Sequence, residues 1–331
     1  MKRLNFGIIG FGKMGSIRYK TLKEMPACGV SWICDIRQPA EIPAGTRYTA
    51  NFEDVLNDAN VDAIVVCTPN DMIKDVVIKG LNKGKHIFSE KPPGRNLAEL
   101  KEMVHAEARN PQMRLMFGFN HRHHDSMVLA KKLVDSGEYG RILWLRGRYG
   151  KSVDENFFSN WRSSKKKAGG GILLDQGIHM VDLFLMLCGD FDEVKACVSN
   201  LYWNLDIEDN VFAIFKNRKG QVASLHSTMT QWRHLFSLEI FMDRGYITIN
   251  GLKTSSNTYG DEAMSIAKNR TAPPAAIWTK EEDLVFHIDN SWKKELEIFA
   301  HSIRNDKAVP VGNTKDALKV MALIDRIYKE R

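Results

Sequence analysis

The feature that most limits how this chain can fold is a glycine-rich loop near its start. The loop, Gly10-Phe11-Gly12-Lys13-Met14-Gly15, follows an apolar, strand-like run over Leu4–Ile9 and opens a helix-like segment. In such a loop the first glycine permits a tight turn, the second lets the backbone approach a diphosphate, and the third allows close packing of helix on strand. The N–H groups at the start of the helix then face the phosphates. The alternative is a glycine turn that binds nothing.

A carboxylate stands where a dinucleotide's ribose would be held. Asp35 ends the second strand-like run, 20 residues after Gly15, and an acidic residue at about this spacing binds ribose hydroxyls. It would repel a 2′-phosphate, which favours NAD over NADP, whereas Arg37 could pair with that phosphate. We therefore expect a dinucleotide site that prefers NAD, formed by Gly10, Phe11, Gly12, Lys13, Met14, Gly15, Asp35 and Arg37.

Residues 1–120 alternate between strand-like and helix-like segments. Apolar strands joined by helices indicate a parallel sheet covered on both faces. We expect an α/β Rossmann domain, a doubly wound parallel sheet, over 1–120. Its predicted strands are 4–9, 30–35, 63–68, 86–89 and 113–119, and its predicted helices are 14–25, 52–58, 72–83 and 97–108.

Residues 121–331 have a different pattern. Strand-like runs at 211–215 and 221–228, and again at 235–241 and 246–249, are separated by turns rich in Asn, Asp and Gly, which indicates antiparallel hairpins. We expect an α+β domain with an open, mostly antiparallel sheet. Its other predicted elements are a strand at 141–149, helices at 127–136, 178–187, 292–302 and 315–328, and a loop over 251–280.

Composition narrows the classes of partner. The net charge of +7 suits a small anionic ligand, and no zinc-finger, RRM-like or basic-region pattern accompanies it, so we expect no nucleic-acid partner. No apolar run approaches the roughly 18 residues of a membrane span, and no cleavage-site pattern follows the start, so we expect no membrane association. The five cysteines are odd in number and lack CxxC spacing, which favours a cytoplasmic location.

Two short motifs follow successive predicted strands, at the sheet edge where ligands of such folds bind. Cys67-Thr68-Pro69-Asn70 could be a plain turn, in which Pro69 stops the strand and Asn70 caps the next helix, or could also contact the cofactor. Ser89-Glu90-Lys91-Pro92-Pro93 is stiffened by its prolines. Lys91 could bind an oxyanion or promote deprotonation of a hydroxyl, or could be an ordinary solvated lysine.

The richest segment runs from Gly169 to Asp182. Its three successive glycines would let backbone come close to a ligand. Asp175 and His179 are spaced i, i+4, so a helix would place them on one face as a hydrogen-bonded pair. Such a histidine can exchange a proton near neutral pH. The alternative is that Asp175 caps the helix and His179 is a core residue.

Two further clusters are candidate ligand sites. The histidines at 121, 123 and 124 cannot easily converge on one ion, so we expect a basic loop and no metal. Trp161 and Arg162, followed by Lys165-Lys166-Lys167, join an aromatic surface to a basic patch. That combination suits a sugar ring bearing a phosphate or carboxylate, and its alternative is a solvated, lysine-rich loop.

Taken in order, these motifs resemble the glucose–fructose oxidoreductase / inositol dehydrogenase / MocA (Gfo/Idh/MocA) family. The resemblance rests on Gly10–Gly15, Glu90-Lys91-Pro92, Gly118-Phe119-Asn120-His121-Arg122 and the Gly169–Asp182 run. It covers nearly the whole chain. It implies a Rossmann domain, an α+β domain whose open sheet mediates oligomer contacts, and hydride transfer between a nicotinamide and a sugar or cyclitol carbinol.

The resemblance also assigns roles. The family's catalytic residues fall on Lys91, Asp175 and His179. It places Trp161, Arg162, Asn120 and Arg122 near substrate, to which the basic patch adds Lys165, and it supports cofactor contacts by Cys67, Thr68, Pro69, Asn70, Glu90 and Lys91. This chain departs from the family at His121 and the histidines after Arg122, where relatives often carry an arginine and an aromatic residue.

The expected function is therefore an NAD-dependent oxidoreductase. His179, oriented by Asp175, would exchange the proton of a ring hydroxyl, while Lys91 stabilises the developing alkoxide. The lysine patch favours an anionic or nucleotide-linked sugar as substrate. The alternatives are a free-sugar or inositol dehydrogenase and, from another class, an NAD-sensing regulator, which the presence of Lys91 and His179 argues against. A homodimer or homotetramer through the open sheet is expected.

Overall fold

The computed structural model describes residues 3–254, 256–268 and 281–330, which form two compact units. A single boundary after residue 120 was predicted, whereas the first unit also takes in two later segments of the chain. The N-terminal unit comprises Met1–Asn120, Lys166–Gly169 and Trp292–Met321, and the second unit comprises His121–Lys165, Gly170–Ser291 and Ala322–Arg331.

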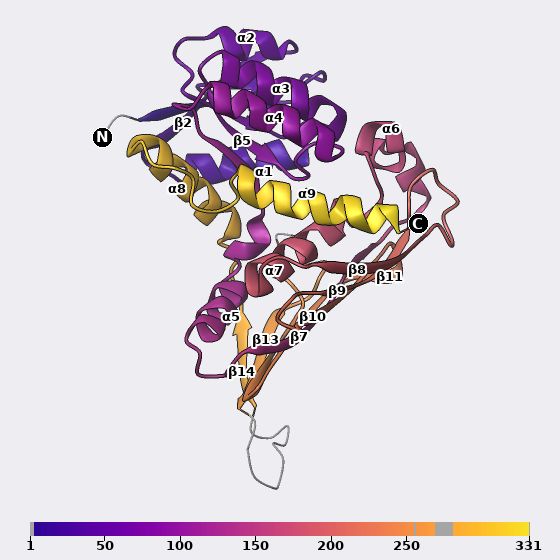
Figure 1. Ribbon diagram of the computed structural model, residues 1–331. Coiled ribbons are helices and arrows are strands. Elements are labelled where there is room, and N and C mark those ends of the chain that lie inside the picture. Colours follow the sequence, from indigo (N-terminus) through magenta and orange to yellow (C-terminus); the bar gives the residue numbers. More distant parts are fainter. Residues whose placement is uncertain (1–2, 255, 269–280, 331) are drawn as a thin grey trace, which may run out of the picture. The chain divides into compact units, whose positions relative to one another are not determined.

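The N-terminal unit is built on a six-stranded parallel sheet in the order β3-β2-β1-β4-β5-β6, which is the Rossmann order. Helices connect successive strands except β2 and β3, which are joined by a loop (Figure 1). The strands are β1 Leu4–Ile9, β2 Cys28–Cys34, β3 Arg47–Thr49, β4 Ala63–Val66, β5 His86–Glu90 and β6 Leu115–Gly118. The helices are α1 Lys13–Lys23, α2 Phe52–Asn57, α3 Asn70–Asn82 and α4 Leu97–Arg109. The predicted fold is confirmed.

Helix α8, Ser291–Arg304, explains why a late segment belongs to the first unit. Its Phe299 is fully buried, with its ring centroid 6.5 Å from that of Phe6 on β1 and 5.8 Å from that of Phe88 on β5. Burying a side chain of this size contributes roughly 2 to 3 kcal/mol. The apolar face of α8 is therefore part of the Rossmann core.

The second unit contains an eight-stranded sheet in the order β14-β13-β12-β11-β7-β10-β9-β8. Both predicted hairpins, β9–β10 and β11–β12, are antiparallel as expected, and β7 and β10 form a parallel pair. The strands are β7 Ile142–Ser152, β8 Glu193–Ser199, β9 Asn210–Lys216, β10 Val222–Thr228, β11 Thr230–Met242, β12 Gly245–Asn250, β13 Glu262–Lys268 and β14 Glu282–Phe286.

One face of this sheet is covered by helix α7, Ile178–Cys188, which packs against β7 and β10 (Figure 1). Gly147 on β7 makes the close approach possible, because a Cβ there would lie 2.4 Å from the sulfur of Met180. The remaining helical segments are η1 Asn120–His123, α5 Asp125–Asp135, η2 Glu155–Ser159, η3 Trp161–Ser163, α6 Lys165–Ala168, the π-helical turn η4 Leu173–Gly177 and α9 Thr314–Lys329.

The predicted loop over 251–280 is wrong for residues 262–268, which form β13. Buried Met264 and Ile266 alternate there with the less buried Ala263 and Ser265. This alternation is typical of a strand but is too short to stand out in the sequence. Residues 255 and 269–280 of the predicted loop lie outside the described part of the chain.

One segment, Lys165–Cys188, has the length and hydropathy of a candidate membrane span. In the fold, 72% of its most apolar window is buried within the protein. Its apolar side chains are therefore accounted for by the protein core.

Candidate functional site

The glycine loop of the N-terminal unit has the geometry that the sequence predicts. Gly10 has a φ of +90°, and a Cβ there would lie 2.5 Å from the carbonyl oxygen of Cys67. A Cβ on Gly15 would lie 2.1 Å from the carbonyl oxygen of Gly10. A Cβ on Gly12, in contrast, would have no atom within 4 Å. Gly12 is the N-cap residue of α1, and no side chain caps this helix N-terminus. Open space before uncapped N–H groups fits a diphosphate.

Asp35 lies beside this loop. One of its carboxylate oxygens accepts a hydrogen bond from the N–H of Phe11 at 2.7 Å, and the other accepts from the N–H of Arg37 at 3.0 Å. The carboxylate therefore fixes the glycine loop and keeps its negative charge at the carboxyl end of β2. This position fits a group that binds ribose hydroxyls and repels a 2′-phosphate.

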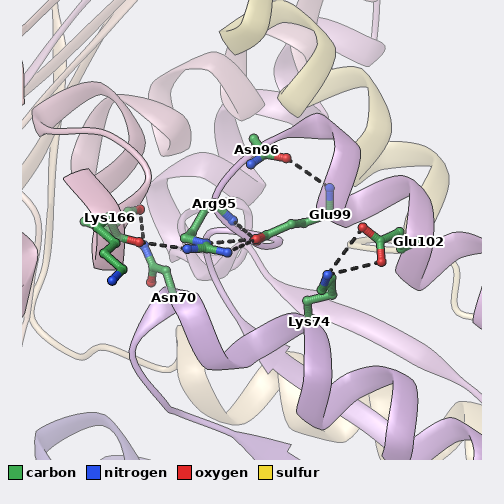
Figure 2. Close-up of polar contacts among 8 residues, drawn as sticks. Asn70, Lys74, Arg95, Asn96, Glu99, Glu102 and Lys166 are labelled. Atoms are coloured by element: carbon green, nitrogen blue, oxygen red, sulfur yellow. Dashed lines mark hydrogen bonds and ion pairs between the residues drawn. The ribbon is translucent and has the colours of Figure 1, made fainter. Parts of the chain in front are cut away.

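Cys67, Thr68 and Pro69 follow β4 at the same edge of the sheet. Asn70 does not cap the next helix as predicted, because Pro69 occupies the N-cap position and Asn70 is the first helical residue. The side-chain amide of Asn70 instead donates to the carbonyl of Ala168 at 2.8 Å. The neighbouring guanidinium of Arg95 binds Glu99 and donates to the carbonyl of Lys166 at 2.8 Å (Figure 2). Both bonds tie the segment Lys166–Gly169 to the N-terminal unit.

Glu90, at the end of β5, belongs to a buried ion network. Its carboxylate accepts from Arg18 at 2.6 Å, and the fully buried guanidinium of Arg18 also binds Glu295 at 2.8 Å. Burial opposes the charge of Arg18, but the two carboxylates raise its pKa above the ordinary value. The rings of Phe88 and Trp292 lie 4.4 and 4.6 Å from the guanidinium carbon. This network anchors the end of β5, which Lys91 follows directly.

In the second unit, Asp175 lies in the π-helical turn and His179 in the first turn of α7. Single π turns inside α-helices occur frequently at functional sites. The carboxylate of Asp175 forms ion pairs with the amine of Lys151, at the end of β7, and with the Nε of Arg162 at 3.5 Å. The side chain of Asp175 is therefore held in place by two cationic groups.

His179 is buried and has an aromatic wall. The imidazole of His121 stacks on it with ring centroids 3.8 Å apart and planes 17° apart. The Nε2 of His121 lies 3.0 Å from the hydroxyl of Tyr149 on β7. His121 was predicted to lie in a basic loop and instead forms part of the surroundings of His179.

Arg122, predicted to contact substrate, forms a bidentate ion pair with the fully buried carboxylate of Asp182 on α7, with one N···O distance of 2.7 Å. Asn120, which was also assigned to the substrate, is buried at the end of the N-terminal unit. Trp161 and Arg162 are half-buried, and the Arg162 guanidinium lies 4.3 Å from the Trp161 ring centroid. Lys165 is exposed, and its backbone N–H binds Asp206.

The three glycines at 169–171 each make room for a group of the protein itself. A Cβ on Gly169 would lie 2.4 Å from the carbonyl oxygen of Arg95, one on Gly170 would lie 2.1 Å from the hydroxyl of Tyr328, and one on Gly171 would lie 2.0 Å from the carbonyl oxygen of Glu208. The triplet is therefore required for packing.

Sequence reasoning missed Lys151, Tyr149 and Glu208. Strand β7 continues to Ser152, three residues past the predicted end, so Lys151 was not placed on the strand. Alternation along β7 could have found it, because Leu145, Tyr149 and Lys151 share the face toward α7. Among residues 3–254, 256–268 and 281–330, no group of three His, Cys, Asp or Glu side chains could hold a metal ion.

Comparisons with known proteins agree with this geometry. Residues 4–119 match the domain family described as "Oxidoreductase family, NAD-binding Rossmann fold", and residues 127–248 match the "GFO/IDH/MocA C-terminal domain". A levoglucosan dehydrogenase from Pseudarthrobacter phenanthrenivorans is 28% identical over 292 residues, which are 76% of this chain and 74% of the relative. A myo-inositol 2-dehydrogenase from Thermotoga maritima is 24% identical, covering 78% of this chain and 79% of the relative.

Solved structures show the same fold. A levoglucosan dehydrogenase in complex with NADH and levoglucosan superposes with a TM-score of 0.85 at 24% identity, covering 99% of this chain and 96% of that one. The WlbA dehydrogenase from Bordetella pertussis, in complex with NADH and UDP-GlcNAcA, gives 0.83 at 22% identity, covering 100% and 96%. With an NAD-binding Rossmann unit and the matching C-terminal domain in one chain, this protein belongs to the Gfo/Idh/MocA family of oxidoreductases.

Proposed function

We propose that this NAD-dependent dehydrogenase oxidises a ring hydroxyl of a neutral cyclic polyol, either a free sugar, an anhydrosugar or a cyclitol. The observation that carries this proposal is the pairing of charge around the predicted catalytic residues. Lys151 and Arg162 bind Asp175, and Arg122 binds Asp182. Each of these three cations is engaged by a carboxylate, and the three cations and two carboxylates together carry a net charge of only 3 − 2 = +1, so they offer little charge to an anionic substrate. The likeness to levoglucosan and inositol dehydrogenases supports the same substrate class.

Proton transfer is assigned to the second unit. His179 takes the proton of the substrate hydroxyl, because a neutral imidazole is a competent base near pH 7. Asp175 stabilises the imidazolium that forms. Its two cationic partners, Lys151 and Arg162, hold and orient this carboxylate.

Lys91 is assigned a separate role. It follows β5 directly, after the buried Arg18–Glu90–Glu295 network. Its ammonium group donates a hydrogen bond to the reacting oxygen and stabilises the alkoxide charge. The glycine loop and Asp35 would hold NAD, which would supply the hydride acceptor needed to oxidise the ring carbon to a ketone.

A nucleotide-linked sugar is the second candidate substrate. The side chains of Lys165, Lys166 and Lys167 are exposed, and the structures similar in fold include WlbA with UDP-GlcNAcA. An exposed triple-lysine segment could pair with a diphosphate without disturbing the ion pairs of Asp175. We also propose that the chain forms a homodimer or homotetramer through its open sheet and acts in the cytoplasm.

The test measures the absorbance of NADH while the protein and NAD are incubated with levoglucosan, myo-inositol, glucose or UDP-GlcNAcA. Turnover of a neutral polyol supports the first candidate, and turnover of UDP-GlcNAcA alone supports the second. Binding of NAD without turnover on any of the four contradicts the assignment as a dehydrogenase of these substrates and favours an NAD-sensing protein.

Variants test the assigned roles on the substrate that is turned over. Lys91→Ala and His179→Ala are each expected to lower kcat by about 10²-fold or more while the Kd for NAD stays unchanged. Lys83→Ala and His301→Ala remove an exposed lysine and an exposed histidine elsewhere, and should retain full turnover. Wild-type kcat in Lys91→Ala or His179→Ala would refute the role of that residue.

A further inference from the structure

Glu208, which lies just before β9, has a carboxylate that the proposed reaction does not use. It is 1% exposed, and a buried carboxylate must be compensated by hydrogen bonds. One oxygen accepts from the N–H of Gly171 at 2.8 Å, and the other accepts from the N–H of Leu173 at 3.1 Å and from the hydroxyl of Tyr328 at 2.8 Å.

The backbone of the same residue completes the set. The N–H of Ile172 donates to the main-chain carbonyl of Glu208 at 3.2 Å. Glu208 therefore accepts hydrogen bonds from three consecutive N–H groups, those of residues 171, 172 and 173. These groups stand at the start of the helical segment that contains the π turn, where N–H groups have no partner within the helix.

The contacts lead from Glu208 to Asp175. The carbonyl of Gly171, whose N–H is held by the carboxylate, accepts the N–H of Asp175 at 3.0 Å. A negative charge at the start of a helix is also favoured by the helix dipole. The glycine triplet allows this arrangement, because a Cβ on Gly170 or Gly171 would collide with Tyr328 or Glu208.

We infer that Glu208 is a positioning residue for the proton-transfer pair: its carboxylate and carbonyl, supported by Tyr328, set the backbone of the π turn and so the places of Asp175 and His179. This inference rests on the proposed function of that pair. A displacement of about 1 Å at reacting groups can lower a rate by about 10²-fold, so a residue that never touches substrate can limit turnover.

Two variants perturb this support to different degrees. Glu208→Gln keeps the size of the side chain but replaces one acceptor by an NH₂ donor, which must face an N–H or O–H donor whichever way the amide lies. Tyr328→Phe removes a single donor and leaves the carboxylate in place. We expect Glu208→Gln to lower kcat by about 10- to 100-fold, and Tyr328→Phe to lower it a few-fold, with the KM for NAD unchanged in both.

Asp209→Asn is the matched control. Asp209 is the next residue and is also fully buried, and its carboxylate likewise accepts three backbone N–H groups, but those of Leu201, Tyr202 and Trp203. This variant should lose stability to a similar degree and keep kcat. A residue that merely stabilised the unit would change the fraction folded without this difference in kcat.

Amide hydrogen exchange in the protein without substrate gives an independent readout. Glu208→Gln should speed exchange at residues 171–179 by about tenfold or more, whereas Asp209→Asn should leave that segment unchanged. Any of three outcomes would overturn the inference. They are unchanged exchange at residues 171–179 in Glu208→Gln, unchanged kcat in Glu208→Gln, and a loss of kcat in Asp209→Asn equal to that in Glu208→Gln. If Glu208→Gln does not fold, the same criteria apply to Tyr328→Phe. Absence of wild-type turnover on the four substrates would count against the proposed function, while exchange still decides the role of Glu208.

Discussion

At the scale of single residues, we predict that Asp35 sets the preference for NAD over NADP. Both of its oxygens are held by backbone N–H groups, of Phe11 and Arg37, so the carboxylate cannot easily turn away from a 2′-phosphate. Asp35→Ser should therefore raise the ratio of kcat/KM for NADP to that for NAD by at least about tenfold, because it removes a like charge a few ångströms from the phosphate.

The measurement is the same ratio in the wild type and in Glu24→Gln. Glu24 is exposed at the C-terminal end of α1 in the same unit, at the opposite end of that helix from the glycine loop, so its substitution removes an equal charge away from the end of β2. If Glu24→Gln changes the ratio as much as Asp35→Ser does, the effect is one of general charge. If neither changes it, Asp35 does not set the preference.

Residues whose partners are local in sequence were easier to predict than residues whose partners are distant. The turn at Gly10 and the role of Gly15 follow from a pattern six residues long and are confirmed by the contacts of both glycines. The ion pair of Asp175 with Lys151 and the hydrogen bonds of Gly171 with Glu208 join positions 24 and 37 residues apart. Only the register of the second sheet brings these residues together, and no local pattern encodes it.

At the scale of elements, two glycines at the start of two helices have opposite purposes. A Cβ on Gly12 would meet nothing within 4 Å, and its φ of −78° suits any residue. A Cβ on Gly171 would lie 2.0 Å from the carbonyl of Glu208. Gly12→Ala should therefore fold normally but weaken NAD binding, because its methyl group occupies the space before the N-terminus of α1.

Gly171→Ala should show the reverse effect. The collision must displace backbone, so we expect a loss of about 2 kcal/mol or more in the free energy of unfolding, with unchanged affinity for NAD in the folded fraction. Thermal melts and calorimetric titration with NAD measure both quantities. A stable Gly171→Ala variant, or a Gly12→Ala variant that binds NAD as tightly as the wild type, would contradict this division.

Elements were predictable where their pattern was long. The buried strands β1 and β4 and the amphipathic helices α8 and α9 follow from periodicity over their whole length. The short strands β3 and β14, and β13 within a polar region, have too few alternating apolar residues to stand out. The π turn was expected to be α-helical. No residue type distinguishes a π-helix from an α-helix in a run such as Leu173-Leu174-Asp175-Gln176-Gly177.

At the scale of the whole molecule, one face of the eight-stranded sheet is left bare by the described residues. The registers of β9, β10, β7 and β11 place Phe212, His226, Arg148 and Ser237 in one row across this face. Phe212 and Ile214 are 53% and 56% exposed, and the rings of Trp144, Phe241 and Tyr246 form a stack along the next strands. Exposed apolar side chains gathered on one sheet face, here in two groups with polar residues of β10 and β7 between them, are typical of a protein–protein interface.

This exposed face is the surface through which we expect the oligomer to form, and a substitution on it tests that prediction. Arg148 and Arg233 line a hollow of about 900 Å³ together with the exposed Phe212 and Ile214, so the surface offers both burial and charge to a second copy. Ile214→Asp places a charge beside Phe212 on this face and should convert a dimer or tetramer to monomers in sedimentation velocity, because burying an unpaired carboxylate costs several kcal/mol. Val128→Asp, which charges an exposed apolar position on α5, should leave the assembly intact. If both variants dissociate the oligomer, an added charge disrupts the assembly wherever it is placed. If the wild type sediments as a monomer, this sheet face does not mediate an oligomer.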